Sequence, residues 1–121
     1  MSGASSRSIA VHPRYRVLRG RDVALGPGKV ELLRHIQTEG SIQKAAARMG
    51  MSYMRAWTLI RVMNKCFRHP LVSTRRGGAR QGGAALTKTG TSVVDLYARI
   101  ERESALATSA CRGQLTRLLR S

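Results

Sequence analysis

Two helices joined by a tight turn are predicted by residues 40–67, GSIQKAAARMGMSYMRAWTLIRVMNKCF. Ser41 and Ser52 each precede an apolar stripe, where a hydroxyl oxygen can accept a free N–H of the first helical turn. Gly50 follows the first stripe, where a residue in the left-handed conformation would end that helix. The apolar positions at helical spacing are Ile42, Ala45, Ala46 and Met49 in the first helix, and Tyr53, Ala56, Trp57, Ile60, Met63 and Phe67 in the second. Such a pair is typical of a helix-turn-helix, although an ordinary pair of packed helices would show the same spacing.

The charge of the chain favours a polyanionic partner. Its 121 residues include 22 Lys or Arg and 6 Asp or Glu, a formal net charge of +16. Nucleic acid is the polyanion that such a protein most commonly binds. An anionic membrane surface is the competitor, but it predicts one basic amphipathic helix, and here the basic residues are spread along the chain. A hydrophobic content of 42% argues against disorder and, with this length, predicts one domain.

The sequence predicts a cytoplasmic, nucleoid-associated protein. No run approaches the roughly 18 to 20 apolar residues of a membrane span. The first residues, MSGASSRSIAVHP, lack the hydrophobic run of a secretory signal. Cys66 and Cys111 are far apart and each lies within a helical pattern, which indicates reduced thiols rather than a disulfide scaffold.

The segment before residue 40 predicts an arm, a hairpin and a helix. Residues 1–13 are small and polar and are expected to form a flexible arm. A short β-hairpin is predicted around the Gly20-Arg21-Asp22 turn, with apolar residues at Tyr15, Val17, Val23 and Leu25. A helix is expected from Pro27 to Gly40. Its expected core positions are Val30, Leu33, Ile36 and Gln37, flanked by Leu32.

A basic wing is predicted after the second helix of the pair. Pro70 prevents that helix from continuing. Residues 71–74 and 84–87 are strand candidates, and between them lies RRGGARQGG, residues 75–83. A disordered linker is the alternative, but two β-compatible flanks and a short span favour a hairpin.

The last long helix is predicted to pair with a second copy of the chain. Thr87 can cap it, and Val94 and Leu96 are expected to widen its buried face. Its heptad-like seam, the expected dimer interface, is Val93, Tyr97, Ile100, Ser104, Ala107 and Cys111. The alternative is a helix that packs only on its own domain. The DNA-binding domain, this helix included, is expected to span residues 14–112, with a tail at 113–121.

The residues described so far resemble a known family. The run from Gly40 to Asn64 and the run TRRGGARQGGAALTKTG, residues 74–90, are similar to the N-terminal DNA-binding domain of ModE-type molybdate-responsive transcription regulators. The resemblance covers about residues 28–105. Its most specific parts are Ser52-Tyr53, Ala56-Trp57, Met63-Asn64 and the double-glycine wing. The helix-turn-helix is also similar to that of LysR-type regulators, but the long wing favours the ModE type.

The resemblance implies a fold and a function. The fold is mainly α with small β-hairpins (α+β), a winged helix-turn-helix with a long C-terminal dimerisation helix. The function is sequence-specific binding of double-stranded DNA as a homodimer through the N-terminal and C-terminal helices. Full-length regulators bind molybdate in separate C-terminal domains, for which this chain has no room, so regulation by molybdate does not carry over from the resemblance. Whether any effector (molybdate, another oxyanion or a metal) is sensed, and whether the target operon is linked to molybdenum, stays open.

The second helix of the pair is predicted to enter a major groove by its N-terminal residues. Arg55 can donate two hydrogen bonds to a guanine edge, and Met54 or Thr58 can touch a thymine methyl group. A phosphate contact without sequence content is the alternative for Arg55 and the preferred interpretation for Arg61. The wing arginines are expected to contact the DNA backbone or the minor groove. The first helix is expected to place its N–H groups on a phosphate. The predicted DNA-binding residues are Ser41, Gln43, Lys44, Ser52, Tyr53, Met54, Arg55, Thr58, Arg61, and the wing residues Arg75, Arg76 and Arg80.

The rival classes are weaker. An enzyme is disfavoured because the few acidic residues form no plausible pair and no nucleophile or G-x-x-x-x-G-K-[ST] motif occurs. A metal-responsive sensor is suggested by Cys66 and His69, with several methionines near them in the sequence. Two ligands do not close a site, so we expect neither a metal nor a cofactor. A nucleoid-type architectural protein would be as basic, and only sequence preference distinguishes it from a regulator.

Overall fold

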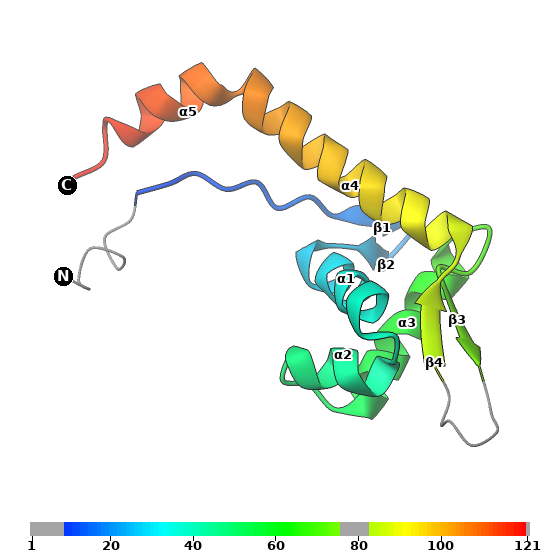
Figure 1. The fold of residues 1–121 in the computed structure, drawn as a ribbon. Helices are drawn as coiled ribbons and strands as arrows, with labels where there is room; N and C mark the ends of the chain where they lie inside the picture. The colour runs from blue at the N-terminus through cyan, green and yellow to red at the C-terminus, as the bar shows by residue number, and fades with distance from the viewer. Residues whose placement is uncertain (1–8, 76–82, 121) are drawn as a thin grey trace.

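The computed structural model describes residues 9–75 and 83–120. Two small antiparallel hairpins and a set of helices confirm the predicted mainly α fold with a wing, and Figure 1 shows how they are arranged. The elements in order are β1 (Val17–Arg19), β2 (Asp22–Leu25), α1 (Pro27–Glu39), α2 (Ile42–Arg48), α3 (Tyr53–Cys66), β3 (Val72–Arg75), β4 (Gly83–Leu86), α4 (Lys88–Ala107) and α5 (Ser109–Thr116). None of the helices in these ranges is long and apolar enough to cross a membrane.

Local side-chain chemistry sets the helix boundaries as the sequence predicts. The hydroxyl oxygens of Ser41, Ser52 and Thr87 accept a backbone N–H in the first turns of α2, α3 and α4. Each bond satisfies one of the N–H groups that a helix start leaves free. Gly40 ends α1 at φ 74°, and Gly50 follows α2 at φ 66°, a backbone conformation that costs glycine little. All three predicted caps and both glycine stops are confirmed.

The core is built around α1, which packs against α2, α4, β2 and β4. Because neighbours cover α1 on several sides, its buried face is wider than one stripe. Leu32, expected only to flank the core, is fully buried, whereas Gln37 is exposed and its predicted core position is wrong. Alanines let the helices approach closely. The fully or almost fully buried residues of the helix pair are Ala45, Ala46, Ala56, Ile60 and Met63.

Both predicted hairpins are present. In the wing, the strands β3 and β4, Val72 pairs with Leu86 and Arg75 pairs with Gly83. Each strand lies one residue from its predicted position, because Leu71 and Thr87 fall just outside the ladder, although the Thr87 N–H still donates to the Leu71 carbonyl at 2.9 Å. In the first hairpin, β1 pairs with β2 across the expected turn.

The C-terminal helix is not continuous, which corrects the prediction of one helix through Cys111. It breaks at Thr108, whose hydroxyl donates to the Ser104 carbonyl at 2.6 Å. A threonine bonded to the carbonyl one turn back competes with the helical pattern and bends a helix. Figure 1 shows α5 turning away from α4 at this point. The expected tail, residues 113–121, therefore begins inside α5; Ser121 lies outside the described residues.

The N-terminal segment, residues 9–16, runs extended along the outer end of α4 and along α5 (Figure 1). Two tyrosines tie it to α4. The Tyr97 hydroxyl donates to the Tyr15 carbonyl at 2.8 Å, and the Tyr15 hydroxyl donates to the Ser104 hydroxyl. Residues 1–8 of the expected arm lie outside the described ranges, and its flexibility stays a prediction.

Candidate nucleic-acid interface

Acidic residues are absent from the middle of the chain. Residues 40–94, here called the acid-free segment, hold α2, α3, the wing and the start of α4 without one Asp or Glu. All 6 acidic residues lie outside it: Asp22, Glu31, Glu39, Asp95, Glu101 and Glu103. The basic residues inside it are Lys44, Arg48, Arg55, Arg61, Lys65, Arg68, Arg75, Arg76, Arg80 and Lys88. A carboxylate can reach these cations only from another part of the fold.

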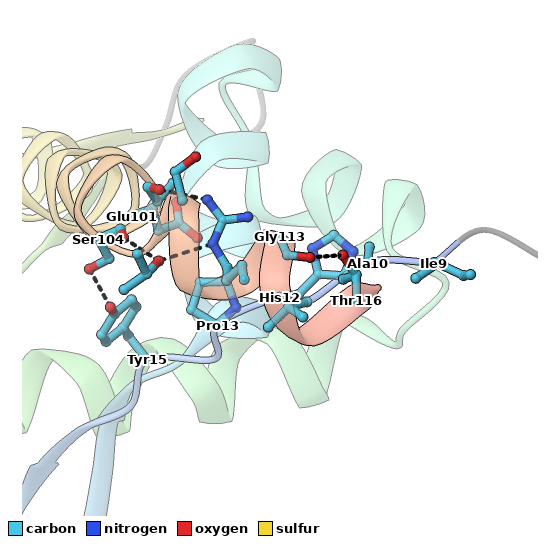
Figure 2. A pocket seen from close by; sticks show the side chains of 14 residues that line it. Ile9, Ala10, His12, Pro13, Tyr15, Glu101, Ser104, Gly113 and Thr116 are labelled. Carbon is cyan, nitrogen blue, oxygen red and sulfur yellow. Dashed lines mark hydrogen bonds between the residues drawn. The ribbon is translucent and has the colours of Figure 1, made fainter. Parts of the chain in front are cut away.

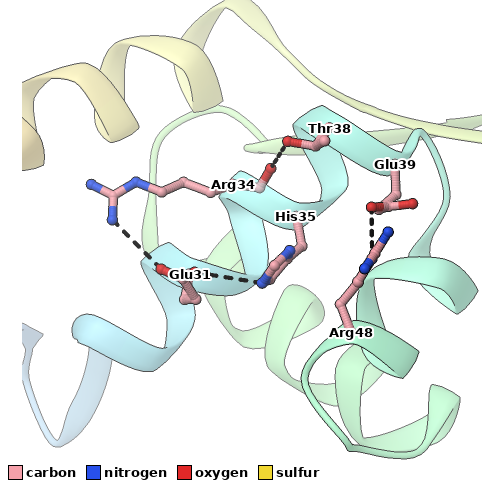
Figure 3. A network of polar contacts seen from close by, with 6 residues as sticks. All are labelled: Glu31, Arg34, His35, Thr38, Glu39 and Arg48. Carbon is pink, nitrogen blue, oxygen red and sulfur yellow. Dashed lines mark hydrogen bonds and ion pairs between the residues drawn. The ribbon is translucent and has the colours of Figure 1, made fainter.

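Few of the ion pairs between described residues involve a side chain of the acid-free segment. Among the described residues, one pair involves a cation of the acid-free segment, with Arg48 Nε 3.0 Å from Glu39 Oε2 (Figure 3). The other pairs join side chains of α1 and α4: Arg34 with Glu31 and Glu101, His35 with Glu31, and Arg99 with Glu103. The cations of α3 and β3 therefore face solvent without a carboxylate partner in the part of the chain that is described.

The first turns of α3 are exposed while its opposite face is buried. Arg55, Thr58 and Arg61 are exposed, and so are Met54, at 70%, and Tyr53, at 46%. Ala56, Ile60 and Met63 hold the helix on the core, so the exposed residues project from one rigid element. The Thr58 hydroxyl donates to the Met54 carbonyl at 3.0 Å, which leaves its methyl group for an apolar contact. This exposed face is the candidate reading surface.

Tyr53 and Trp57 form a pair at the start of α3. Tyr53 belongs to the apolar stripe but was also predicted as an exposed DNA-binding residue, and it is exposed, whereas Trp57, expected to be partly or wholly buried, is half-buried. At the exposed start of α3 the two rings pack on each other, edge to face at 6.5 Å between centroids. The Trp57 Nε1–H donates to the Tyr53 hydroxyl at 2.5 Å. The hydroxyl proton of Tyr53 then points elsewhere and is free for an acceptor.

The other predicted contact residues lie on α2 and the wing. Gln43 and Lys44 are exposed on α2, whereas the oxygens of Ser41 and Ser52 already accept the N–H groups of Lys44 and Arg55. Arg75 is exposed at the end of β3. Arg76 and Arg80 lie outside the described residues. No bound DNA tests these residues, and their contacts stay predictions.

The predicted dimer seam is divided between the core and the surface. Tyr97 is only 3% exposed and Val93 packs against the core, because the first half of α4 lies on α1. These two residues belong to the interior of this chain, contrary to the expectation of a free seam. Ser104 is half-buried beside Tyr15, while Ile100, Ala107 and Cys111 are exposed. Val94 is buried as expected, but Leu96 is exposed.

Other exposed apolar side chains lie near both ends of the chain. Leu115, Leu118 and Leu119 follow the seam in the sequence, where they were expected either to continue the dimer surface or to fray, and all three are exposed. Sequence reasoning did not single out Ile9 and Leu106, which are exposed as well.

An open trough of about 750 Å³ separates the N-terminal segment from α4 and α5. Figure 2 shows His12, Pro13 and Tyr15 on one side and Glu101 and Ser104 on the other. Some of its polar groups bond within the chain: Arg112 donates to the Thr108 hydroxyl at 3.0 Å and to the Ala105 carbonyl at 2.6 Å. The trough lies beside the exposed apolar residues of α4 and α5 rather than beside the acid-free segment.

The described residues contain no group of three or more His, Cys, Asp or Glu that could hold a metal ion. Cys66 is half-buried and Cys111 is exposed, and both are free thiols, as the sequence predicts.

Comparison with known proteins confirms the resemblance to ModE-type regulators. No family model matches the chain. The chain is 42% identical over 71 residues to the DNA-binding transcriptional dual regulator ModE of Escherichia coli K12, covering 59% of this chain and 27% of that protein. It is 40% identical over 78 residues to the transcriptional regulator ModE of Haemophilus influenzae, covering 64% and 31%.

A relative with a different name shows the same partial coverage. The molybdenum-pterin-binding protein MopB of Rhodobacter capsulatus is 38% identical over 85 residues, covering 70% of this chain and 32% of that protein. The chain thus spans less than a third of the length of the curated relatives that it matches. The similarity to LysR-type regulators stays a prediction.

Proposed function

We propose that this chain, which resembles the N-terminal domain of ModE-type regulators, binds double-stranded DNA in a sequence-specific manner and regulates transcription. The observation that carries the proposal is the acid-free segment, whose cations on the exposed face of α3 and on β3 have no carboxylate partner within residues 9–75 and 83–120. A phosphate backbone attracts such a surface whatever the base sequence. The exposed residues at the start of α3 add groups that can distinguish bases.

In this proposal α3 lies in a major groove. Arg55 reads a guanine, Met54 or Thr58 touches a thymine methyl group, and Arg61 contacts a phosphate. The remaining predicted contacts fix the register on the backbone: Ser41, Gln43, Lys44, Ser52, Tyr53, Arg75, Arg76 and Arg80.

The proposal includes a homodimer formed through α4, α5 and the N-terminal segment. Ile100, Ala107 and Cys111 form the exposed remainder of the seam, next to the leucines of α5 and the trough. A monomer rarely leaves apolar side chains gathered in this way without a partner. Two-fold pairing would carry two copies of α3 to one DNA duplex, so the operator would be an inverted repeat. The DNA-binding domain in this scheme is residues 14–112, and the protein works in the cytoplasm on the nucleoid.

A nucleoid-type architectural protein is the second candidate, because basic residues continue outside the acid-free segment at Arg14, Arg16 and Arg19. Such a protein binds through the electrostatic contribution alone and prefers no sequence. A metal-responsive sensor gains no support from the ligand types in the described residues.

Selection of genomic DNA fragments by the purified chain tests the proposal. A regulator is expected to enrich fragments that share an inverted repeat, and to bind them on the order of a thousandfold or more tightly than unrelated duplexes. The neighbouring genes would identify the target, including any link to molybdenum. Fragments without a common motif, bound with the same salt dependence as bulk DNA, would instead establish the architectural candidate.

A further inference from the structure

The segment Pro70–Val72, here called the wing base, is held to α3 by one side chain. The Oδ1 of Asn64 accepts the N–H of Leu71 at 2.8 Å and the N–H of Val72 at 3.3 Å. The Nδ2 of Asn64 lies 3.4 Å from the Val72 carbonyl, to which it donates. Both polar ends of the amide are therefore used on the wing base, one turn from the end of the recognition helix.

The opposite side of the wing base is held by the start of α4. The Thr87 N–H donates to the Leu71 carbonyl at 2.9 Å, and the Thr87 hydroxyl donates to the Pro70 carbonyl at 2.6 Å. Gly90 lies so close that an added Cβ would stand 2.1 Å from the Leu71 carbonyl oxygen. The wing base is thus fixed between α3 and α4, and Leu71 is fully buried there.

The two wing strands are attached by different means. β4 packs on α1 and α4, and its Ala84 N–H donates to the Gly40 carbonyl at 2.9 Å. β3 packs mainly on β4. Within residues 9–75 and 83–120, the hydrogen bonds of Asn64 are the only ones from an α3 side chain to this strand or its base. Asn64 is therefore the direct polar link between the recognition helix and the strand that ends in Arg75.

We propose that Asn64 is a positioning residue for DNA binding: it holds the wing at a fixed orientation to α3, so that helix and wing meet the DNA as one unit. This inference rests on the proposed function and gives a role to a residue that is not itself expected to contact DNA. A preorganised surface avoids the loss of conformational freedom that a loosely held hairpin would suffer on binding. Without Asn64, the wing is still anchored through β4 and Thr87, but β3 and Arg75 lose their direct hydrogen bonds to α3 and can shift relative to that helix.

The test is a double-mutant cycle between Asn64 and Arg75, with affinity measured over a salt series. The probe is a mixed-sequence duplex long enough for two half-sites about one helical turn apart. In the wild-type background, Arg75→Ala is expected to weaken binding about tenfold and to reduce the salt slope by about one unit. In the Asn64→Ala background, Arg75→Ala should weaken binding less than about threefold, because Arg75 is then no longer held where it contacts the DNA.

Two further measurements separate positioning from loss of stability. Val30→Ala removes buried atoms from α1 but leaves the hydrogen bonds of the wing base intact, and the effect of Arg75→Ala should stay about tenfold in that background. Hydrogen exchange of the Leu71 and Val72 amides, followed by NMR without DNA, should accelerate in Asn64→Ala and stay slow in Val30→Ala. Alanine favours helices, so Asn64→Ala should fold; if it does not, Asn64→Gln, which moves the amide by one methylene, takes its place.

The outcomes distinguish this inference from the proposed function. If wild type binds no duplex, the proposed function and the inference both fail. If wild type binds and Arg75→Ala costs the same factor in every background, only the positioning role of Asn64 is overturned. Unchanged exchange of the two amides in Asn64→Ala would overturn it as well.

Discussion

The helices α3 and α4 both bury one face in the same core, but their exposed faces differ in charge. The charged residues of α3 are Arg55, Arg61 and Lys65, all basic. On α4 the charges balance, with Lys88, Arg99 and Arg102 against Asp95, Glu101 and Glu103. The Glu103 carboxylate lies 2.7 Å from Arg99 Nε, and this contact raises the pKa of the Arg99 guanidinium.

The difference suggests which partner each face can accept. A face with unpaired cations repels a second copy of a chain whose net charge is +16, and it attracts a polyanion. A face with balanced charges and exposed Leu96, Ile100 and Leu106 avoids that repulsion locally and gains from apolar contact. One chain can then hold DNA on the α3 side and its own copy on the α4 side.

The largest expected effect concerns the charge on the α3 side. Replacing Arg75, Arg76 and Arg80 together with alanine should weaken binding to every duplex by up to about a thousandfold and reduce the salt slope by about three units. The cause is the loss of three phosphate contacts. Filter binding over a salt series measures both quantities. Replacing Arg14, Arg16 and Arg19 with alanine removes the same charge outside the acid-free segment and should change the salt slope much less. Equal salt slopes for the two triple variants would show that the α3 side does not differ from the rest of the chain in its contacts with DNA.

The next largest effect concerns the α4 side. Ile100→Asp places an unpaired carboxylate in the proposed dimer interface and should weaken association by at least about 3 kcal/mol, on the order of a hundredfold. Ile100 is 44% exposed in the single chain, so the fold should persist. Sedimentation at moderate salt is the measurement, because low salt strengthens the repulsion between two basic copies. Ser92→Asp adds the same charge to an exposed position of α4 and should leave the dimer intact. A wild-type monomer would rule this interface out.

A smaller effect is expected at Trp57, where the reading surface meets the core. A fully buried aromatic residue loses roughly 3–5 kcal/mol on truncation, and the half-buried Trp57 should lose about 2 kcal/mol in Trp57→Ala. Trp57→Phe keeps an aromatic ring but removes the N–H that holds the Tyr53 hydroxyl. It should retain most of the stability and lose part of the DNA affinity. Thermal melts and duplex binding separate the two effects, and a Trp57→Ala variant as stable as wild type would show that the ring stabilises nothing.

The parts of this fold that depend on near neighbours in the chain were predictable from the sequence. Ser41, Ser52 and Thr87 cap helices because a hydroxyl and an N–H three residues later are always close, whatever surrounds them. Gly40 and Gly50 end helices for an equally local reason. Both hairpins were predicted from turn residues between β-compatible segments, although each wing strand lies one residue from its predicted position.

Several errors share a different cause, because they depend on what covers a helix. Gln37 has the spacing of a core position in α1, yet it is exposed. Tyr97 has the spacing of a dimer seam, yet α1 and the N-terminal segment bury it within one chain. The role of Asn64 depends on residues 71 and 72, which only the folded wing brings to it. Periodicity alone does not contain this information.

The fourth prediction sharpens the comparison within α3 itself. Arg55 and Arg61 are both exposed, one near the start of the helix and the other almost two turns later. Arg55→Ala should reduce the preference for the correct base by roughly tenfold at one or two base pairs and change binding to unrelated duplexes little. Arg61→Ala should weaken binding to all sequences alike. Competition binding against single-base variants of a selected operator measures the base preference and the general affinity. Identical base preferences for Arg55→Ala and Arg61→Ala would show that the two arginines do not divide into one that recognises a base and one that contacts a phosphate.

The smallest expected effect lies at the alkaline end of the pH range, and it belongs to the α4 side. Burial raises the pKa of the Tyr97 hydroxyl above its ordinary value of 10.0; Glu101 adds to the rise, and Arg34 and Arg14 oppose it. The folded chain therefore favours the neutral hydroxyl, which donates to the Tyr15 carbonyl. The stability that this preference contributes is complete below the unfolded pKa and is lost as the pH rises through the higher, folded-state value.

Denaturant midpoints measured between about pH 9 and pH 11 test this last prediction. Wild type is expected to lose stability over that range, and Tyr97→Phe, which has no proton to lose, should lose less of it. At neutral pH Tyr97→Phe should be slightly less stable, because the Tyr15 carbonyl loses its donor. Tyr53 is exposed at the start of α3, so Tyr53→Phe removes a hydroxyl outside the core, is the matched control and should leave the alkaline loss as in wild type. Equal alkaline curves for wild type and Tyr97→Phe would mean that the link between α4 and the N-terminal segment adds nothing to the pH dependence.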